Sequence, residues 1–172
     1  VNAPENQVFA ADVNATDADG DATVGYVISG GADAGKFDLN STTGVLTFKT
    51  APDFETPASA ASNNAYLVEV NASDGTAWDL QTITVTVTNV NDEAPVITSD
   101  GGGSTATASV AENQTAVTTV TASDPDGDAV TYSKVGGADQ AKFSINPSTG
   151  VLTFTSAPNF ENPTDAGTNN TY

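Results

Sequence analysis

Apolar and polar residues alternate along several short stretches of this chain. The clearest is residues 82–89, Thr-Ile-Thr-Val-Thr-Val-Thr-Asn, in which each apolar residue is β-branched and lies between hydroxyl-bearing residues. This pattern is typical of a strand with one buried face and one solvent-exposed face. Residues 66–72 have a similar pattern, and the turn sequence Ser73-Asp74-Gly75-Thr76 lies between the two stretches. The sequence therefore predicts a β-hairpin.

Other short stretches also have the composition of strands, and they are bounded by Asp, Gly, Asn or Pro clusters that favour turns. They are residues 7–15, 23–28, 36–39 and 44–49. No segment has a sustained helical period. About seven short strands in about 106 residues are typical of an antiparallel Greek-key sandwich. The predicted fold class is therefore all-β, with immunoglobulin-like sandwiches.

The sequence also repeats itself. Asp17-Ala18-Asp19-Gly20-Asp21 recurs as Asp124-Pro125-Asp126-Gly127-Asp128, 107 residues later. Thr-Gly-Val-Leu-Thr-Phe at residues 43–48 recurs at residues 149–154, 106 residues later. A repeat of this length indicates tandem domains, each of which mainly contacts its neighbours.

The repeat predicts one domain at residues 1–92 and a second at residues 93–172. Tyr172 matches Tyr66, so we expect the second domain to be truncated and to lack its last two strands. Because nothing before Val1 matches the start of the second repeat, we also expect part of the first strand to be missing. A chain whose first and last repeats are both incomplete is expected to be an excerpt from a longer array.

Charge and composition narrow the chemistry. The chain has 22 acidic and 4 basic residues, with a formal charge of -18, so it repels nucleic acid and anionic membrane, and cations are its natural partners. It contains no histidine, cysteine or methionine, which excludes thiol and imidazole chemistry. Its apolar runs are far shorter than the roughly 20 residues that span a bilayer, so no membrane span is predicted.

Acidic residues recur at fixed places relative to the predicted strands. The groups are Glu5, the pair Asp17 and Asp19, the pair Asp53 and Glu55, Asp74, and the stretch Asn89-Val90-Asn91-Asp92-Glu93-Ala94-Pro95. Calcium prefers six to eight oxygen ligands from carboxylates, amides and backbone carbonyls. Carboxylates placed close together require protons or cations to neutralise them. The pattern therefore predicts calcium binding.

This combination and order of motifs resembles the cadherin repeat in the form found in large bacterial surface proteins. The resemblance covers essentially the whole chain. It implies seven-stranded sandwiches joined end to end, with up to three Ca²⁺ ions at each junction. The ligands that it implies for the junction inside this chain are Glu5, Asp53 and Glu55, then Asn89, Asn91, Asp92 and the carbonyl of Glu93, then Asp124 and Asp126.

The resemblance also implies incomplete sites and one weakened position. Asn89 stands where the family usually has aspartate, which implies weaker binding of one ion. The Ala-x-Asp-x-Gly aspartate of the second repeat is expected beyond Tyr172, which leaves the third ion one ligand short. Two further half-sites are implied, one at the upstream junction from Asp17, Asp19 and Asp74, the other downstream from Glu112, Asn159 and Glu161.

Other motifs have simpler interpretations. Asp17-Ala18-Asp19-Gly20-Asp21 resembles the start of an EF-hand loop, but Ala22 and Ile28 stand where that loop needs glycine and glutamate. Residues 30–36 resemble a phosphate-binding loop, but Phe37 replaces its hydroxyl residue. Paired acids can also serve glycoside hydrolysis, yet a repeated unit would duplicate the whole active site.

The sequence therefore favours a non-enzymatic module, rigidified by calcium, from a surface-anchored or secreted adhesin. The expected location is extracellular, and the expected partners are neighbouring cadherin-like repeats, like molecules or polysaccharide ligands. The alternative is a calcium-dependent carbohydrate-binding module with Trp78 and Tyr66 as its platform. For Trp78 alone, local packing is the favoured interpretation, because tryptophan is large and usually mostly buried.

Overall fold

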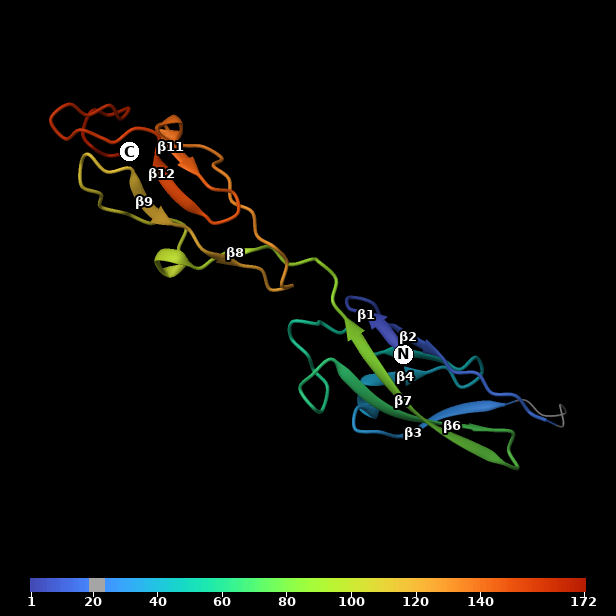
Figure 1. Ribbon diagram of the computed structural model, residues 1–172. Helices are drawn as coiled ribbons and strands as arrows, with labels where there is room; N and C mark the ends of the chain where they lie inside the picture. Colours follow the sequence, from blue (N-terminus) through green and yellow to red (C-terminus); the bar gives the residue numbers. More distant parts are fainter. Residues whose placement is uncertain (19–23) are drawn as a thin grey trace. The chain divides into compact units, whose positions relative to one another are not determined.

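The computed structural model describes residues 1–18 and 24–172, which form two compact units. Unit 1 is Val1–Asn91 and unit 2 is Asp92–Tyr172 (Figure 1). The described residues form β-strands and three short 3₁₀ turns, η1 (Ala34–Lys36), η2 (Ser99–Gly101) and η3 (Gln140–Lys142). The predicted all-β class is confirmed. Thr23, the first residue of one predicted strand, lies outside the described residues.

Unit 1 contains two sheets. In order across the first sheet, the strands are β1 (Asn2–Pro4), β7 (Trp78–Thr88), β6 (Ala65–Ser73) and β3 (Gly25–Gly30). In order across the second sheet, they are β2 (Phe9–Asp12), β5 (Val45–Phe48) and β4 (Phe37–Leu39). The two sheets enclose one hydrophobic core between them, so unit 1 is a β-sandwich.

The β6–β7 hairpin is the longest paired element of unit 1. Its register runs without a break from Ser73↔Trp78 at the turn to Ala65↔Thr86. Val68 and Val85 on its inner face are fully buried, whereas the threonines of β7 face outward. This confirms the predicted hairpin. The strand β7 begins four residues earlier than the sequence pattern predicts, because its first part extends beyond the core.

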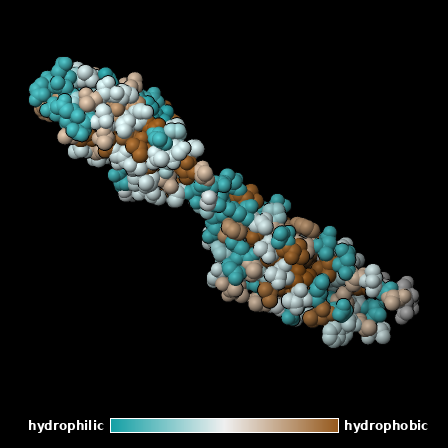
Figure 2. Space-filling view, in the orientation of Figure 1, coloured by the Kyte–Doolittle hydropathy of each residue, from teal (hydrophilic) through white to brown (hydrophobic). Residues whose placement is uncertain are grey.

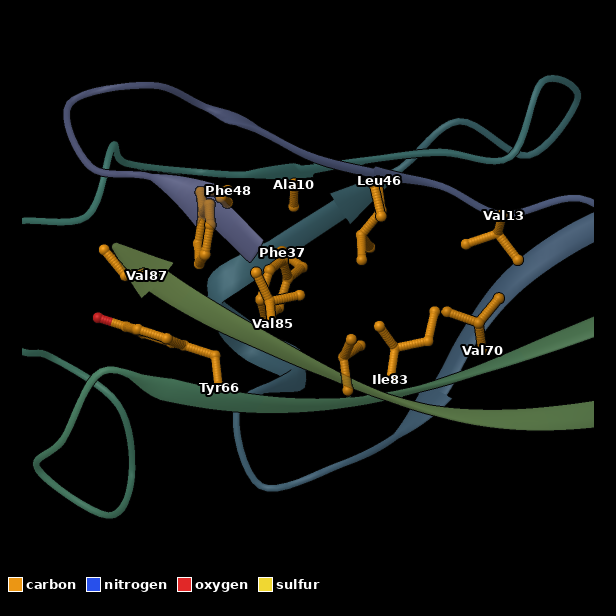
Figure 3. Close-up of a cluster of buried hydrophobic side chains, with 13 residues drawn as sticks. Ala10, Val13, Phe37, Leu46, Phe48, Tyr66, Val70, Ile83, Val85 and Val87 are labelled. Atoms are coloured by element: carbon orange, nitrogen blue, oxygen red, sulfur yellow. The ribbon is translucent and has the colours of Figure 1, made fainter. Parts of the chain in front are cut away.

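Three aromatic rings pack together in the core, near Val87 (Figure 3). The ring centroids of Phe37 and Phe48 are 4.6 Å apart, and Tyr66 meets Phe48 edge-on at 5.2 Å. The Tyr66 hydroxyl accepts a hydrogen bond from the Ala58 backbone N–H at 3.0 Å, so the ring is buried without leaving its oxygen unsatisfied. Burial of each such side chain contributes about 1.5–3 kcal/mol.

The parallel pairing of β1 with β7 differs from the prediction. The sequence pattern predicts an antiparallel sandwich, but Asn2 pairs with Thr86 and Pro4 with Thr88 in parallel register. Ala3 is buried beneath this pair. Three residues are too few to show a period of two, and their partner lies more than 80 residues away in the chain. Local pattern therefore could not predict this strand.

Unit 2 has shorter strands. They are β8 (Val96–Ile97), β9 (Ala116–Thr119), β10 (Ala122–Ser123), β11 (Phe143–Ile145) and β12 (Val151–Phe154). The strand β12 lies between β11 and β9, and β8 pairs with β10. Phe143, Phe154 and Tyr172 repeat the aromatic arrangement of unit 1, with centroids 4.8 Å apart for the two phenylalanines and 5.1 Å apart for Phe154 and Tyr172.

The apolar face of unit 2 is open. A cavity of about 690 Å³ is lined by Phe143, Leu152, Phe154 and Tyr172 among others. In unit 1 the matching aromatic residues lie beneath the β6–β7 hairpin, and residues 92–172 contain no sequence that matches residues 67–88. Residues 131–136, which match β3 at the offset of 106 residues, form no strand. We attribute this to the missing partner, since β3 pairs with β6 in unit 1.

Hydrophilic and intermediate surface covers most of both units, with hydrophobic patches between (Figure 2). Threonine, serine, asparagine and aspartate on the outer strand faces and in the loops account for this surface. The larger exposed apolar side chains include Trp78 in unit 1 and Val135 and Phe160 in unit 2.

A hairpin appended to unit 2 should complete its core. We predict that a copy of residues 67–91 joined after Tyr172 raises the thermal midpoint of unit 2 by about 10 °C or more, because the added valines and isoleucine bury apolar surface. Differential scanning calorimetry measures the midpoint. The matched control carries the same extension with its inward-facing Val and Ile residues replaced by Ser, and it should leave the midpoint unchanged. An equal effect of both extensions would contradict the prediction.

Candidate metal-binding site

Glu5 is a buried carboxylate that joins two segments of unit 1. It is only 2% exposed. One oxygen, Oε1, accepts the Val90 backbone N–H at 2.8 Å, and the other, Oε2, accepts the Phe54 backbone N–H at 2.7 Å. The charge is therefore buried with a donor on each oxygen, which offsets part of its desolvation cost. Glu5 directly follows β1, and its partners lie in the segments that follow β5 and β7. The site therefore lies at the end of the sandwich where these three strands finish.

Glu55 lies beside Glu5. A carboxylate oxygen of each lies within 4.8 Å of the other. Asp53 is on the same loop and is exposed, and its Oδ1 accepts the Thr56 N–H at 2.7 Å, which caps the turn. The structure thus brings the predicted ligands Glu5 and Glu55 together. Asp53 is not among the carboxylates that lie within 4.8 Å of one another.

The linker residues of unit 1 follow the end of β7 at Thr88. Asn89, Val90 and Asn91 are exposed, and Val90 is held through its N–H by Glu5. An asparagine side chain offers a neutral oxygen, which calcium accepts as a ligand. The linker of unit 1 is therefore tied to the carboxylate pair at its middle residue.

Unit 2 begins with a second carboxylate clamp. The Oδ2 atom of Asp126 accepts the backbone N–H groups of Asp92 at 3.2 Å and Glu93 at 2.9 Å. A carboxylate oxygen of Asp92 lies within 4.8 Å of one of Asp126. Asp124 is joined to this group because its Oδ1 accepts the Asp126 N–H at 3.0 Å. Asp92, Glu93, Asp124 and Asp126, which are predicted ligands, therefore lie close together within unit 2.

Two of the four lysines are engaged elsewhere. Lys49 lies 4.0 Å from Asp38 in an ion pair on the outer side of β4 and β5, and Lys134 donates to the carbonyls of Gln140 and Phe143. Neither lysine neutralises the carboxylates at Glu5 or Asp126. The atoms that these acidic residues offer to a metal ion are carboxylate oxygens, which suit a hard divalent cation such as Ca²⁺.

The predicted upstream half-site is only partly described. Asp17 and Asp74 line one cavity of about 680 Å³ in unit 1. The Oδ1 atom of Asp74 accepts the N–H groups of Ala77 at 2.6 Å and Thr76 at 2.7 Å, and these bonds lower the pKa of Asp74 below its usual value. Asp74 thus caps the β6–β7 turn with its Oδ1 atom. Asp19 lies outside the described residues.

The predicted downstream half-site repeats part of the Glu5 arrangement. The Oε2 atom of Glu112 accepts the Phe160 N–H at 3.0 Å, and Asn159 Oδ1 accepts the Asn162 N–H at 3.0 Å. Glu112 and Glu161 are both exposed. Glu5 is buried in part by the segment after β7, and residues 92–172 contain no match to that segment, which accounts for the exposure of Glu112.

The sequence patterns did not indicate the structural role of three aspartates, of which Asp33 and Asp165 are buried. Asp33 accepts the N–H groups of Ala60 at 2.6 Å and Leu67 at 2.8 Å, so it ties a loop to β6. Asp139 similarly accepts from Ala166. Burial raises the pKa of Asp165, but backbone N–H donors from three later residues outweigh burial and lower it overall. The repeated Gly-Gly-Ala-Asp motif was the available signal for the first two.

The same motif explains the false resemblance to a phosphate-binding loop. Gly31 has φ of +100°, and a Cβ there would lie 2.5 Å from the Val68 Cα. Glycine is therefore required for close approach to β6. The residues after it form a single 3₁₀ turn, η1, which is too short to present a helix N-terminus to phosphate.

The two aromatic residues of the predicted sugar platform do not lie on one surface. Tyr66 is 2% exposed and belongs to the core, so its predicted platform role is wrong. Trp78 is 67% exposed, so its predicted local packing is also wrong. Tyr66 shares the inward parity of Val68 on β6, whereas Trp78 lies where β7 extends beyond the core.

Comparison with known proteins identifies the fold. The family model described as "Bacterial Ig domain" matches residues 91–171. Human Protocadherin-24 EC1-2 has a TM-score of 0.72 at 24% identity, covering 94% of this chain and 76% of that one. Mouse Cadherin-23 EC22-24 has a TM-score of 0.67 at 24% identity, covering 93% of this chain and 51% of that one.

Sequence relatives agree with the structures. Protocadherin Fat 2 of Rattus norvegicus is 37% identical over 151 residues, which are 83% of this chain and 3% of that protein. Protocadherin Fat 1 of Homo sapiens is 32% identical over 158 residues, which are 87% of this chain and 3% of that protein. This chain consists of cadherin-like repeats. It spans only a small part of the length of these curated relatives. In the described part of these repeats, no helix has the length and apolar character needed to cross a membrane.

Glu5 and Glu112 allow a matched test of the buried carboxylate. Both oxygens of Glu5 accept hydrogen bonds from backbone N–H groups. In Glu5→Gln the side-chain N–H₂ group replaces one of these oxygens, so one backbone N–H then faces another donor and loses its acceptor. We predict a loss of about 1–3 kcal/mol in the free energy of unfolding of unit 1, measured by urea titration. Glu112→Gln, at an exposed position where the side chain accepts the Phe160 N–H through one oxygen, should cost much less. Similar losses for both variants would contradict this account.

Proposed function

We propose that this chain is a calcium-binding extender module of an extracellular protein, either surface-anchored or secreted, that serves adhesion. Calcium ions bind the linker region and hold adjacent cadherin-like repeats in one arrangement. The module has no catalytic role. Its partners are the neighbouring repeats, and adhesion to like molecules or to surface ligands resides in the whole array.

The observation that carries this proposal is the attachment of the linker backbone to a carboxylate in each unit. In unit 1 Glu5 accepts the N–H of Val90. In unit 2 Asp126 accepts the N–H groups of Asp92 and Glu93. Along the chain Val90 and Asp92 are separated by one residue. Each unit therefore attaches its acidic residues to the same short stretch of sequence, and in this proposal a divalent cation takes carboxylate and amide oxygens from that stretch.

The charge of the proposed ligand set matches calcium. Glu5, Asp53, Glu55, Asp92, Asp124 and Asp126 are six carboxylates, and three divalent ions would balance them. The full proposed ligand set also includes Asn89, Asn91 and the Glu93 carbonyl. Asn89 contributes a neutral oxygen where a carboxylate would bind more strongly. We therefore expect two ions to bind more tightly than the third.

Calcium acts by linkage in this proposal. It binds the arrangement in which both half-sites share an ion more tightly than arrangements in which they do not, and stabilises it by RT ln(1 + [Ca²⁺]/Kd). Without calcium, clustered carboxylates repel one another. The linker thus changes from flexible to rigid when calcium is bound. The calcium-dependent carbohydrate-binding alternative, with Trp78 and Tyr66 as a joint platform, is not proposed because Tyr66 lies in the core.

Isothermal titration calorimetry with CaCl₂ tests the proposal. We predict binding of at least two ions per chain, and a fall of about tenfold or more in calcium affinity for Asp126→Asn, which removes a carboxylate charge. Asp100→Asn is the charge-matched control, because Asp100 is an exposed acid of unit 2 outside the proposed ligand set. It should leave the affinity nearly unchanged. Absence of calcium binding, or equal losses in both variants, would refute the assignment.

A further inference from the structure

The outer face of the β3–β6–β7 sheet carries an exposed apolar patch near the β6–β7 turn. Val27, Trp78 and Leu80 are 58%, 67% and 44% exposed. They belong to two neighbouring rows of the sheet, because Val27 and Leu80 both pair with Asn71, and Trp78 pairs with Ser73. Successive residues of a strand alternate between faces, so these side chains lie opposite to the buried Val68 and Val85.

The row that contains Trp78 is shallow. Ser73 is its neighbour on β6 and Gly25 its neighbour on β3. The Ser73 hydroxyl donates to the Ala77 carbonyl at 2.7 Å, so it is held down against the turn. Gly25 has no side chain. The indole ring is therefore flanked by open surface along the row, and the larger Val27, Asn71 and Leu80 form one wall beside it.

The patch is too small for a stable protein partner. Neighbouring strands lie about 4.8 Å apart and same-face residues about 6.7 Å apart, so three strands by two rows give a surface of roughly 10 by 7 Å. A stable protein interface needs about 800 Å² from each partner and about 20–30 residues. Six residues in two rows suit a ligand of about two sugar rings instead.

Charge also selects the ligand. The six residues of the two rows, Gly25, Val27, Asn71, Ser73, Trp78 and Leu80, carry no formal charge. The chain as a whole has a net charge of -18, so a second copy or an acidic polymer is repelled. A neutral polysaccharide pays no such penalty. Its pyranose rings present weakly positive C–H groups that pack on the negative face of an indole.

We propose that this face of unit 1 is a binding site for a neutral polysaccharide, with Trp78 as the stacking platform. The row Gly25–Ser73–Trp78 holds one sugar ring against the indole, and Val27 with Leu80 contacts the next. The two rows contain no carboxylate, so binding does not require calcium. The site is independent of the proposed calcium-binding function.

Neutral β-1,4-linked hexasaccharides of glucose, mannose and N-acetylglucosamine serve as probes, and an oligogalacturonate of equal length serves as the acidic comparison. Trp78 is the only tryptophan of the chain, so intrinsic indole fluorescence reports on this site alone. We predict a saturable change in emission with at least one neutral probe, unchanged by EDTA, and none with oligogalacturonate. Calorimetry should give a fall of about tenfold or more in affinity for Trp78→Ala.

Two further variants separate binding from folding. Gly25→Leu fills the shallow row without touching the indole, and a Cβ at Gly25 meets only backbone oxygens at 3.8 Å, so the variant should fold and lose binding. Leu67→Ala removes an exposed apolar side chain from another row of the same face and should bind as the parent does. Absence of binding to every neutral probe, or equal affinity in Gly25→Leu and the parent chain, would overturn the proposal. Self-association that Trp78→Ala abolishes would also overturn it, because the occupant would then be a second copy.

Discussion

The buried carboxylate of Glu5 constrains the linker end of unit 1. A charge that is 2% exposed persists only if both of its oxygens are satisfied, and the donors come from segments that follow β5 and β7. The strand β1, the Phe54 loop and the linker must therefore converge at one point. The same convergence places Glu55 beside Glu5. Burial of one acid thus organises a potential metal ligand set and fixes where the linker leaves the sandwich.

The β6–β7 hairpin plays the corresponding role for the core. Its inner face supplies the valines that cover Phe37 and Phe48, and Tyr66 completes the aromatic cluster. Unit 2 keeps the aromatic cluster but not the cover, and its apolar face stays open. Comparison of the two units shows which strand pairs form in the absence of the hairpin and which do not. The β11–β12 pair forms without the hairpin, whereas the residues of unit 2 that match β3 do not form a strand.

The sequence predicts those features that depend on local pattern. Alternation of Thr with Ile or Val identifies the hairpin, and recurrence of the Asp-rich motif groups Asp124 with Asp126. Their place beside the start of unit 2 was implied only by the resemblance to cadherin repeats. Features set by distant partners were missed. The strand β1 is too short to show a period, and the two N–H donors of Glu5 come from remote segments. Trp78 was misassigned because β7 continues past the core, where residues on both strand faces contact solvent.

Asn89 was the residue that sequence comparison marked as the weak point of the proposed calcium site. It is exposed at the end of β7, one residue before the N–H that Glu5 holds. A neutral amide at this position lowers the charge of the ligand set without disturbing the Glu5 clamp. In the proposed mechanism, affinity for the last ion is therefore separable from the Glu5 clamp, since the clamp belongs to the fold and the ion count to the side chains.

The central claim is that calcium restrains the linker, and a distance distribution between the two units tests it most directly. The chain has no cysteine, so spin labels at Asp38→Cys in unit 1 and Ser144→Cys in unit 2, both exposed positions, report without background. Pulsed electron paramagnetic resonance should show a broad distribution in EDTA that narrows on addition of CaCl₂. A width that calcium leaves unchanged would contradict the account.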